Sequence, residues 1–309
     1  MPLYLTEDDV AALLTPADAV EAVEGCFRRL ASGSVENAPR RRLALEDGRL
    51  ADMAASDVEL GYAGAKVYAG FASGARFVVV LFRADAPELV AVLEADALGR
   101  LRTGAASGVA ARHLAREGAV SLGVIGCGWQ AETQVACIRA AVPAIERVVA
   151  YCRTPESLER FCRATGAEAA ESHRDAAEQD VVVTITTSRD PVLRGEWLNP
   201  GAVVCACGAN VLGARELDNV VLERAAFVCC DSKEQALLES SDLVEPIERG
   251  ALDWLEVHEL QEVVSGDVQG RQSPDDIVVF KSNGLAAWDV AVATRTVELA
   301  RERGLGREV

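Results

Sequence analysis

The stretch Val120-Ser-Leu-Gly-Val-Ile-Gly-Cys-Gly-Trp-Gln-Ala131 decides the fold. An apolar, strand-like run leads straight into Gly126-Cys127-Gly128, and a helical pattern follows. Gly126 permits a tight turn and Gly128 lets the backbone approach a pyrophosphate, while the helix that follows presents free N–H groups to the same anion. An ordinary glycine-containing βα turn is the competing interpretation. The strand, turn, helix and second strand in succession favour a dinucleotide site.

Beyond this motif, strand-like runs alternate with helical stretches, which is typical of a parallel α/β sheet. The predicted strands cover 120–125, 148–151, 181–186, 203–205 and 226–230, and the predicted helices cover 133–141, 155–163 and 233–238. A long helical pattern over 284–303 closes the chain. No internal repeat or low-complexity linker interrupts it.

The first third of the chain has a different pattern. A helix is expected over 16–31, with Thr15 as its N-cap and Pro16 at its first position. Short β-like runs then follow at 42–45, 50–54, 64–68, 77–82 and 90–93, and a helix is expected over 105–116. Consecutive strands with short links indicate an antiparallel or mixed sheet. If the closing helix returns to this part, the α/β part is an insertion.

Composition limits the classes of function. The 309 residues carry 48 acids against 31 bases, a net charge of −17, which repels nucleic-acid backbones and anionic lipid surfaces. The nine cysteines are odd in number and lie largely in apolar runs, and the three histidines are far apart, so neither a disulfide framework nor a metal site is expected. With no basic leader and no membrane-length apolar run, a cytoplasmic location is expected.

The second strand of the nucleotide motif ends in Cys152-Arg153-Thr154. Sites specific for NAD usually place an acid here to bind the ribose 2′-hydroxyl, whereas a guanidinium suits the 2′-phosphate of NADP. We therefore expect NADP(H) to be favoured, with NAD(H) left open. A solvent-facing Arg153 is the simpler alternative.

Three cationic positions are candidates for binding an anionic substrate in this acidic chain. At most two of Arg40-Arg41-Arg42 share a strand face, and they either hold a carboxylate or protect an exposed sheet edge. Lys66 lies in an apolar strand-like run; if buried, its pKa falls and it becomes suited to proton transfer, and otherwise it faces water.

Arg102 is expected at the head of the helix of small residues that follows it. A cation at a helix N-terminus opposes the helix dipole unless an anion also lies there. A capping-region arginine paired with Glu94 or Asp96 is the alternative.

Taken together, these motifs resemble the ornithine cyclodeaminase and mu-crystallin family, over essentially the whole chain. The resemblance is carried by Pro39-Arg40-Arg41, Gly64-Ala65-Lys66, Leu101-Arg102-Thr103-Gly104-Ala105-Ala106, Gly126-Cys127-Gly128-Trp129-Gln130-Ala131, Gly208-Ala209-Asn210, Arg215-Glu216-Leu217-Asp218 and Lys281-Ser282-Asn283-Gly284-Leu285-Ala286. It implies an α/β fold in which a Rossmann-type doubly wound sheet domain, residues 116–284, is inserted into an α+β substrate-binding and dimerisation domain formed by residues 1–115 and 285–309. It also implies a homodimer.

The resemblance implies roles for particular residues. Lys66 matches the active-site lysine that assists proton transfer, and Arg102 matches the arginine that grips the substrate carboxylate. Arg41 matches a second carboxylate-binding arginine, although the register could instead select Arg40, and Asn283 matches a substrate-facing position. With the glycine turn and the second strand, the expected coenzyme-binding set is Gly126, Gly128, Trp129, Gln130, Arg153, Thr154, Thr186 and Ser282.

One departure bears on the reaction. Cyclodeaminases of the family carry an aspartate where this chain has Asn210, which joins Lys66 and Arg102 in the expected catalytic set, and an asparagine takes up no proton. The hypothesis is therefore reversible, NAD(P)H-dependent reduction of a small α-imino acid, cyclic or formed from a 2-oxo acid and an amine. The alternatives are cyclodeamination of ornithine or lysine with bound NAD, and non-catalytic NADPH binding like that of the crystallin members.

Overall fold

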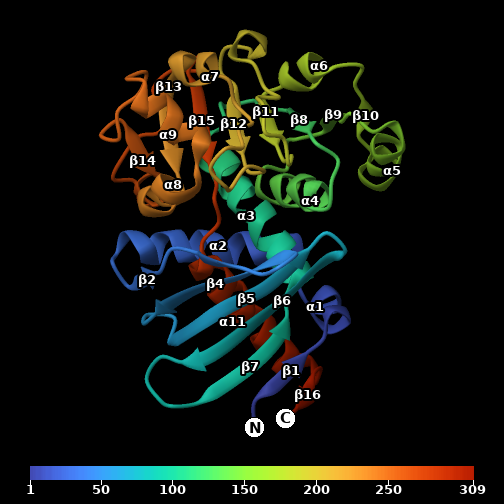
Figure 1. Ribbon diagram of the computed structural model, residues 1–309, viewed down its shortest axis with the longest axis vertical. Coiled ribbons are helices and arrows are strands. Elements are labelled where there is room, and N and C mark those ends of the chain that lie inside the picture. Colours follow the sequence, from blue (N-terminus) through green and yellow to red (C-terminus); the bar gives the residue numbers. More distant parts are fainter. The chain divides into compact units, whose positions relative to one another are not determined.

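The computed structural model describes residues 1–309, which separate into two compact units (Figure 1). The mixed-sheet unit contains Met1–Arg102 and Gly284–Val309, and the parallel-sheet unit contains Thr103–Asn283. The first boundary falls inside helix α3 (Asp96–Leu114) rather than after it. The second boundary falls between Asn283 and Gly284. The parallel-sheet unit is thus an insertion in the mixed-sheet unit.

The mixed-sheet unit is built on one sheet with the strand order β16-β1-β7-β6-β5-β4-β2, and β3 pairs with β4. Its pairs are antiparallel apart from β1 with β7. The strands are β1 (Leu3–Leu5), β2 (Val35–Asn37), β3 (Arg41–Ala44), β4 (Gly48–Asp57), β5 (Tyr62–Phe71), β6 (Gly74–Arg83), β7 (Leu89–Glu94) and β16 (Arg307–Glu308). The mixed sheet expected from the sequence is confirmed.

The helices of this unit are α1 (Glu7–Leu13), α2 (Pro16–Ala31) and α11 (Ala286–Arg303). Helix α2 begins where predicted, because the Thr15 hydroxyl accepts the Asp18 N–H and the Asp18 carboxylate accepts from Thr15 in return. Helix α11 packs against α2, β4 and β5 and is buried along most of its length. The Trp288 ring meets Phe27 edge-on at 5.4 Å, which joins α11 to the apolar face of α2.

Helix α3 begins earlier than predicted. The sequence placed a helix over 105–116, whereas α3 starts at Asp96. The backbone N–H groups of Asp96 and Ala97 donate to the Glu7 carboxylate, at 2.5 and 2.9 Å, so a distant acid caps the first turn. Arg102 therefore lies within the helix, and its expected position at the helix head is wrong.

The parallel-sheet unit contains an eight-stranded, all-parallel sheet in the order β10-β9-β8-β11-β12-β15-β13-β14. The strands are β8 (Ser121–Ile125), β9 (Arg147–Tyr151), β10 (Glu168–Ala169), β11 (Val181–Thr184), β12 (Val203–Ala206), β13 (Ala225–Cys230), β14 (Val257–Glu259) and β15 (Ile277–Lys281). The helices are α4 (Ala131–Ala141), α5 (Pro155–Thr165), α6 (His173–Ala177), α7 (Asn219–Arg224), α8 (Lys233–Glu239), α9 (Ser241–Glu248) and α10 (Leu260–Ser265), with a 3₁₀ turn at Gly195–Trp197. This confirms the α/β class.

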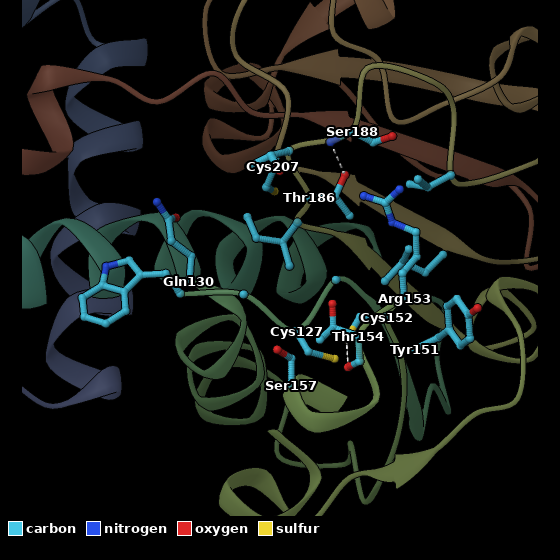
Figure 2. A pocket seen from close by; sticks show the side chains of 18 of the residues that line it. Cys127, Gln130, Tyr151, Cys152, Arg153, Thr154, Ser157, Thr186, Ser188 and Cys207 are labelled. Carbon is cyan, nitrogen blue, oxygen red and sulfur yellow. Dashed lines mark hydrogen bonds between the residues drawn. The ribbon is translucent and has the colours of Figure 1, made fainter. Parts of the chain in front are cut away.

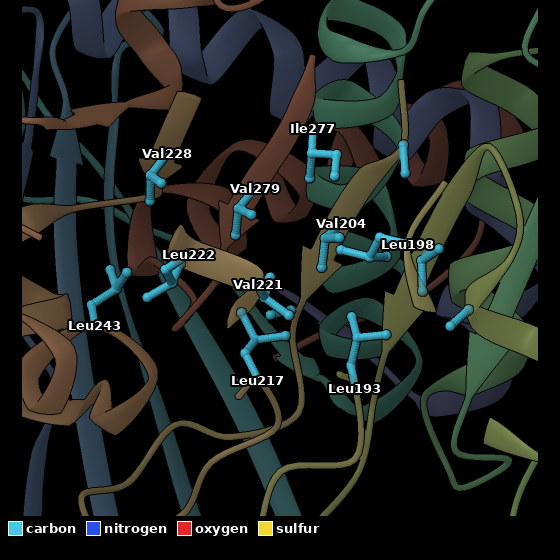
Figure 3. Packing of buried hydrophobic residues seen from close by; sticks show 14 of the residues in the cluster. Leu193, Leu198, Val204, Leu217, Val221, Leu222, Val228, Leu243, Ile277 and Val279 are labelled. Atoms are coloured by element: carbon cyan, nitrogen blue, oxygen red, sulfur yellow. The ribbon is translucent and has the colours of Figure 1, made fainter. Parts of the chain in front are cut away.

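One face of the sheet packs into an apolar cluster that fixes the strand ends (Figure 3). Val204, Val279 and Val228 come from three neighbouring strands and meet Leu217 and Val221. Such buried strands read as continuous apolar runs, which explains why β12 and β13 were visible in the sequence, although β15 was not predicted. No helix of the structure is both long and apolar enough to span a bilayer.

Candidate active site

A cavity of about 410 Å³ lies at the carboxyl ends of β8, β9 and β11 in the parallel-sheet unit (Figure 2). In open α/β sheets this edge is where nucleotides bind. Many of the predicted coenzyme residues line this cavity. They are Gly126, Gly128, Trp129, Gln130, Arg153, Thr154 and Thr186, and Asn210 lines it too. The sequence motif and the cavity therefore coincide.

The glycine turn has the geometry that a pyrophosphate requires. Gly126 has φ +106°, a backbone conformation that residues with a side chain rarely adopt. A Cβ at this position would also lie 2.5 Å from the Ile185 carbonyl oxygen, so only glycine fits. Gly128 has open space where its Cβ would be. Helix α4 follows, and its N-cap residue Gln130 makes no side-chain capping bond; its Oε1 is buried without a hydrogen-bond partner. These features fit a dinucleotide.

The end of β9 forms the second wall of the cavity, with Arg153, Thr154 and Ser157 along it. Thr154 precedes α5 without a side-chain capping bond, so its hydroxyl is not used on its own helix. His173 faces the same wall, and burial together with the Arg153 charge lowers its pKa. The cavity lining contains no Asp or Glu, the residue types that bind a ribose diol.

A buried carboxylate organises the third wall. Glu216 Oε1 accepts the Thr186 N–H at 2.7 Å and the Thr186 hydroxyl at 2.8 Å, and its Oε2 accepts the Gly208 and Ala209 N–H groups at 2.6 and 3.1 Å. Four donors on one carboxylate tie the end of β11 to the loop after β12. That loop carries Asn210.

A second ion pair supports Glu216 from behind. Lys281 and Asp242 are both fully buried, with Nζ 3.2 Å from Oδ2. Asp242 Oδ1 accepts the N–H groups of Glu216 and Leu217, and Lys281 Nζ donates to the Ala209 carbonyl at 2.5 Å. The loop from 208 to 217 is therefore held at both ends by buried charge.

Ser282 and Asn283 do not line the cavity. The Ser282 hydroxyl and the Asn283 N–H both donate to Asp231 Oδ2, at 3.1 and 2.6 Å. Both residues are buried directly after β15. Among the described residues, no cluster of three or more His, Cys, Asp or Glu is arranged to hold a metal ion.

The mixed-sheet unit holds a separate cluster of buried charge. Lys66 on β5 and Arg102 on α3 both donate to Asp289 Oδ1 on α11, at 3.0 and 3.2 Å. Lys66 and Arg102 are 4 and 7% exposed and Asp289 is 1% exposed. The other carboxylate oxygen, Asp289 Oδ2, is buried without a hydrogen-bond partner.

Arg40 belongs to this cluster, and Arg41 lies outside it. A Cβ at Gly284 would lie 2.6 Å from Arg102 Nη1 and 3.3 Å from Arg40 Nη2, so the two guanidiniums converge on this glycine. Arg40 is buried and its Nη2 donates to the Gly284 carbonyl. Arg41 is exposed and pairs with Asp52 at the surface. The register that selects Arg40 therefore fits the structure.

The electrostatics of the cluster act on Lys66. Burial lowers its pKa to about 8; the Asp289 carboxylate opposes this, and the Arg102 and Arg40 charges add to it. The ammonium also lies over the Phe77 ring, 5.3 Å from its centroid. A lysine in this state exchanges a proton near neutral pH, which an exposed lysine does not.

Two organising residues were missed in the sequence. Asp289 lies in Ala286-Ala-Trp-Asp-Val-Ala-Val-Ala293, and a lone acid in an apolar helix signals a buried partner for a cation. Glu216 belongs to the motif Arg215-Glu216-Leu217-Asp218. The residues around Glu216 in the sequence do not indicate that its carboxylate accepts four hydrogen bonds, because the donors lie in two separate loops.

Comparison with known proteins decides the family. The ornithine cyclodeaminase/mu-crystallin family matches residues 2–304. The chain belongs to this family. Alanine dehydrogenase of Archaeoglobus fulgidus is 35% identical over 319 residues, covering 99% of this chain and 98% of that protein. The structure of Thermococcus litoralis Δ1-pyrroline-2-carboxylate reductase with NADH and L-proline matches with a TM-score of 0.93 and 30% identity, over 99% of this chain and 100% of that one.

A second family structure bears on coenzyme and assembly. An archaeal alanine dehydrogenase, solved as a dimer with bound NAD, matches with a TM-score of 0.93 and 33% identity, over 100% of this chain and 98% of that one. Coverage is nearly complete in each comparison, so the family relationship extends over both units.

Proposed function

We propose that this family member reduces a small α-imino acid to the amino acid with NADP(H), and runs the reverse oxidation. The class of enzyme, a nicotinamide-dependent oxidoreductase acting on CH–NH or CH–NH2 groups, follows from the family and its similar members. The observation that carries the proposal is the burial of Lys66 and Arg102 on the Asp289 carboxylate, with the Arg40 guanidinium converging beside Arg102 on Gly284. Guanidinium and ammonium groups buried close together suit a carboxylate substrate.

The guanidiniums are assigned to the substrate carboxylate. Arg40 and Arg102 converge on Gly284, where a side chain would fill the space beside them. The planar fork of an arginine matches a carboxylate in two parallel hydrogen bonds, and burial strengthens both. Binding here fixes the Cα of the substrate close to Lys66, and such positioning accounts for much of the rate in this class of reaction.

Lys66 is assigned to the substrate nitrogen. When bound, the coenzyme supplies a hydride to the imine carbon, or accepts one from the amino acid Cα in the reverse direction. In reduction the Lys66 ammonium protonates the imine nitrogen, and in oxidation the neutral amine takes the proton back. With a pKa of about 8, Lys66 serves both directions close to neutral pH. Asp289 holds the ammonium in place.

The preference for NADP(H) is part of the proposal. Arg153, the Thr154 hydroxyl and Ser157 lie along one wall of the cavity, and no acid is present to bind the ribose 2′-hydroxyl. This chemistry suits a 2′-phosphate. The similar structures contain NADH and NAD, and the proposed preference for NADP(H) rests on the cavity lining of this chain.

A homodimer is also proposed. The similar alanine dehydrogenase was solved as a dimer. In this chain the strands of the mixed sheet leave apolar side chains in solvent, with Leu43 58%, Phe71 47% and Phe82 43% exposed. Covering these groups with a second copy would remove apolar area from water. Light scattering would then give twice the chain mass, and a monomer at micromolar concentration would overturn this part.

Cyclodeamination remains the rival within the family, and Asn210 argues against it. Asn210 lines the coenzyme cavity, where the family resemblance places an aspartate in cyclodeaminases. An amide takes up no proton and therefore does not assist the expulsion of ammonia. The chain keeps what simple hydride transfer needs: a carboxylate grip, a proton donor and a coenzyme site.

The test is a turnover panel. The enzyme is mixed with NADPH and, in turn, with pyrroline-2-carboxylate, piperideine-2-carboxylate, and pyruvate with ammonia or methylamine, and coenzyme absorbance is followed. Coenzyme oxidation with amino-acid formation on at least one of these is expected. Background rates on all of them would overturn the proposal. Ammonia release from ornithine without net coenzyme consumption would instead identify the cyclodeaminase.

A further inference from the structure

Two cysteines lie close together at the mouth of the glycine turn. The Gly126 N–H donates to the Tyr151 carbonyl at 2.9 Å, which joins the ends of β8 and β9. Cys127 and Cys152 are the residues that directly follow this bonded pair. Neighbouring strands lie about 4.7–4.9 Å apart, and a disulfide needs Cα atoms about 4.4–6.8 Å apart. Ile125 pairs with Tyr151, so Cys127 and Cys152 follow the ends of two paired strands one step out of register, at strand ends whose spacing lies within the range that a disulfide spans.

The two thiols also interact. The Cys127 thiol is within hydrogen-bonding range of Cys152, and both residues line the coenzyme cavity, where Figure 2 shows them together near Thr154. Cys127 is 6% exposed, whereas Cys152 is partly exposed and its thiol donates to the Thr154 carbonyl at 3.3 Å. All nine cysteines of the structure are reduced. The partly exposed thiol of Cys152 thus lies beside the buried thiol of Cys127.

We propose that Cys127 and Cys152 form a reversible disulfide that closes the coenzyme cavity when the protein meets a peroxide. This inference rests on the proposed function only in assigning the cavity to the nicotinamide coenzyme. The bond would tether the turn that receives the pyrophosphate to the strand end that receives the adenosine ribose. It would also place two bonded sulfurs in the space between these walls. The oxidised protein then binds coenzyme weakly.

The chemistry balances with hydrogen peroxide as the oxidant. The Cys152 thiol gives up its proton and its sulfur attacks one peroxide oxygen; the O–O bond breaks, the departing oxygen takes up that proton and leaves as water, and Cys152 becomes a sulfenic acid. The Cys127 sulfur then attacks the Cys152 sulfur, the S–O bond breaks, and a second water leaves. Two thiols and one peroxide become one disulfide and two waters. Cys152 is assigned the first step because it is reachable, whereas burial raises the pKa of Cys127 and keeps that thiol protonated.

Coenzyme and disulfide exclude each other in this account. A nucleotide in the cavity covers Cys152, so saturating NADPH should slow disulfide formation. By the same linkage, the disulfide should weaken NADPH binding. Abundant reduced coenzyme would keep the enzyme active, and depletion of coenzyme would leave it open to oxidation.

The experiment measures the bond and the binding separately. The full-length protein is treated with hydrogen peroxide, with and without saturating NADPH, and digested with trypsin without reduction. A disulfide between the fragments 117–139 and 148–153 is expected, with fragmentation placing it at Cys127 rather than Cys137. The Kd of NADPH, followed by coenzyme fluorescence, should rise about tenfold or more and return on treatment with dithiothreitol. Neither readout depends on turnover, so failure of the proposed reaction would not mimic failure here.

Three variants sharpen the test. Cys127→Ala and Cys152→Ser should each abolish the change in NADPH affinity caused by peroxide, judged against the same variant before oxidation. Cys162→Ser removes a neighbouring half-buried thiol outside the cavity and should keep the full change. A disulfide between fragments 148–153 and 161–163 would join Cys152 to Cys162 and would overturn the proposed pairing of Cys152 with Cys127. A Cys127–Cys152 bond that forms equally fast under NADPH, with affinity unchanged, would overturn the mutual exclusion.

Discussion

Lys66 Nζ lies 3.0 Å from Asp289 Oδ1, although 223 residues separate the two in the chain. The pair joins a strand of the mixed sheet to helix α11, which follows the inserted unit. Arg102 shares the same carboxylate oxygen. Asp289 is therefore the group that allows two cations to be buried together, and it sets how readily Lys66 gives up its proton.

Replacing that carboxylate should move the pH profile. In Asp289→Asn the influence that raises the Lys66 pKa is lost, while burial and the arginine charges still lower it. The pKa of Lys66 should therefore fall below about 8. Reduction needs protonated Lys66, so its alkaline limb should move to lower pH and the rate at neutral pH should fall. The pH dependence of kcat/KM, measured for both proteins, checks this. An alkaline limb at the same pH in both would show that a group other than Lys66 titrates.

The two adjacent arginines provide a matched pair. Arg40→Gln removes a buried guanidinium from the cluster, and a charge-assisted hydrogen bond is worth about 1.5–3 kcal/mol, so KM for the imino acid should rise roughly 10- to 150-fold. Arg41→Gln breaks only a surface pair with Asp52, so KM should be unchanged. Steady-state kinetics on both variants show which of the two arginines binds the substrate carboxylate. The reverse pattern would restore Arg41 as the carboxylate ligand.

Coenzyme preference should depend on Arg153. Arg153→Gln should raise the Kd of NADPH by about 10- to 100-fold, from the loss of a charge-assisted contact to the 2′-phosphate, and leave that of NADH within about twofold. Arg163→Gln is the control. Arg163 lies on α5, the helix that follows Arg153, and pairs with Glu159 at the surface. Equal weakening of both coenzymes in Arg153→Gln would contradict a 2′-phosphate contact.

Glu216 should matter for both stability and coenzyme binding. In Glu216→Gln an amide NH2 replaces one acceptor, and in either orientation it faces backbone N–H groups. The loss is expected to be about 1–3 kcal/mol, which lowers Tm by about 2–4 °C for each kcal/mol, and NADPH binding should weaken as the wall loosens. Glu196→Gln, at the exposed 3₁₀ turn, should change neither. Calorimetry and fluorescence titration measure both effects.

The sequence predicted the parts of the molecule that depend on local pattern. The glycine turn at Gly126, the N-cap at Thr15 and the buried strands β8, β11 and β12 follow from neighbouring residues. Strand β15 was missed although its residues are apolar. It pairs between β12 and β13, out of chain order, so the neighbouring residues do not indicate its place in the sheet.

Long-range pairing explains the remaining differences. The start of α3 depends on Glu7, 89 residues before Asp96. The choice of Arg40 over Arg41 depends on which of the two neighbouring side chains faces Gly284, which is distant in sequence. Asp289 and Glu216 act through partners on other elements. The site's chemistry was therefore predictable by residue type, whereas the residues that hold it in place were not.

The most direct test of the central claim is single-turnover reduction of an imino acid from the panel by NADPH in Lys66→Met. The rate should fall by about 10²- to 10⁴-fold, because the proton donor to the imine nitrogen is gone, while the Kd of NADPH stays within about twofold of the unaltered protein. Lys233→Met, on α8, serves as the control and should react at the normal rate. Reduction by Lys66→Met within a few-fold of the unaltered protein would contradict the account.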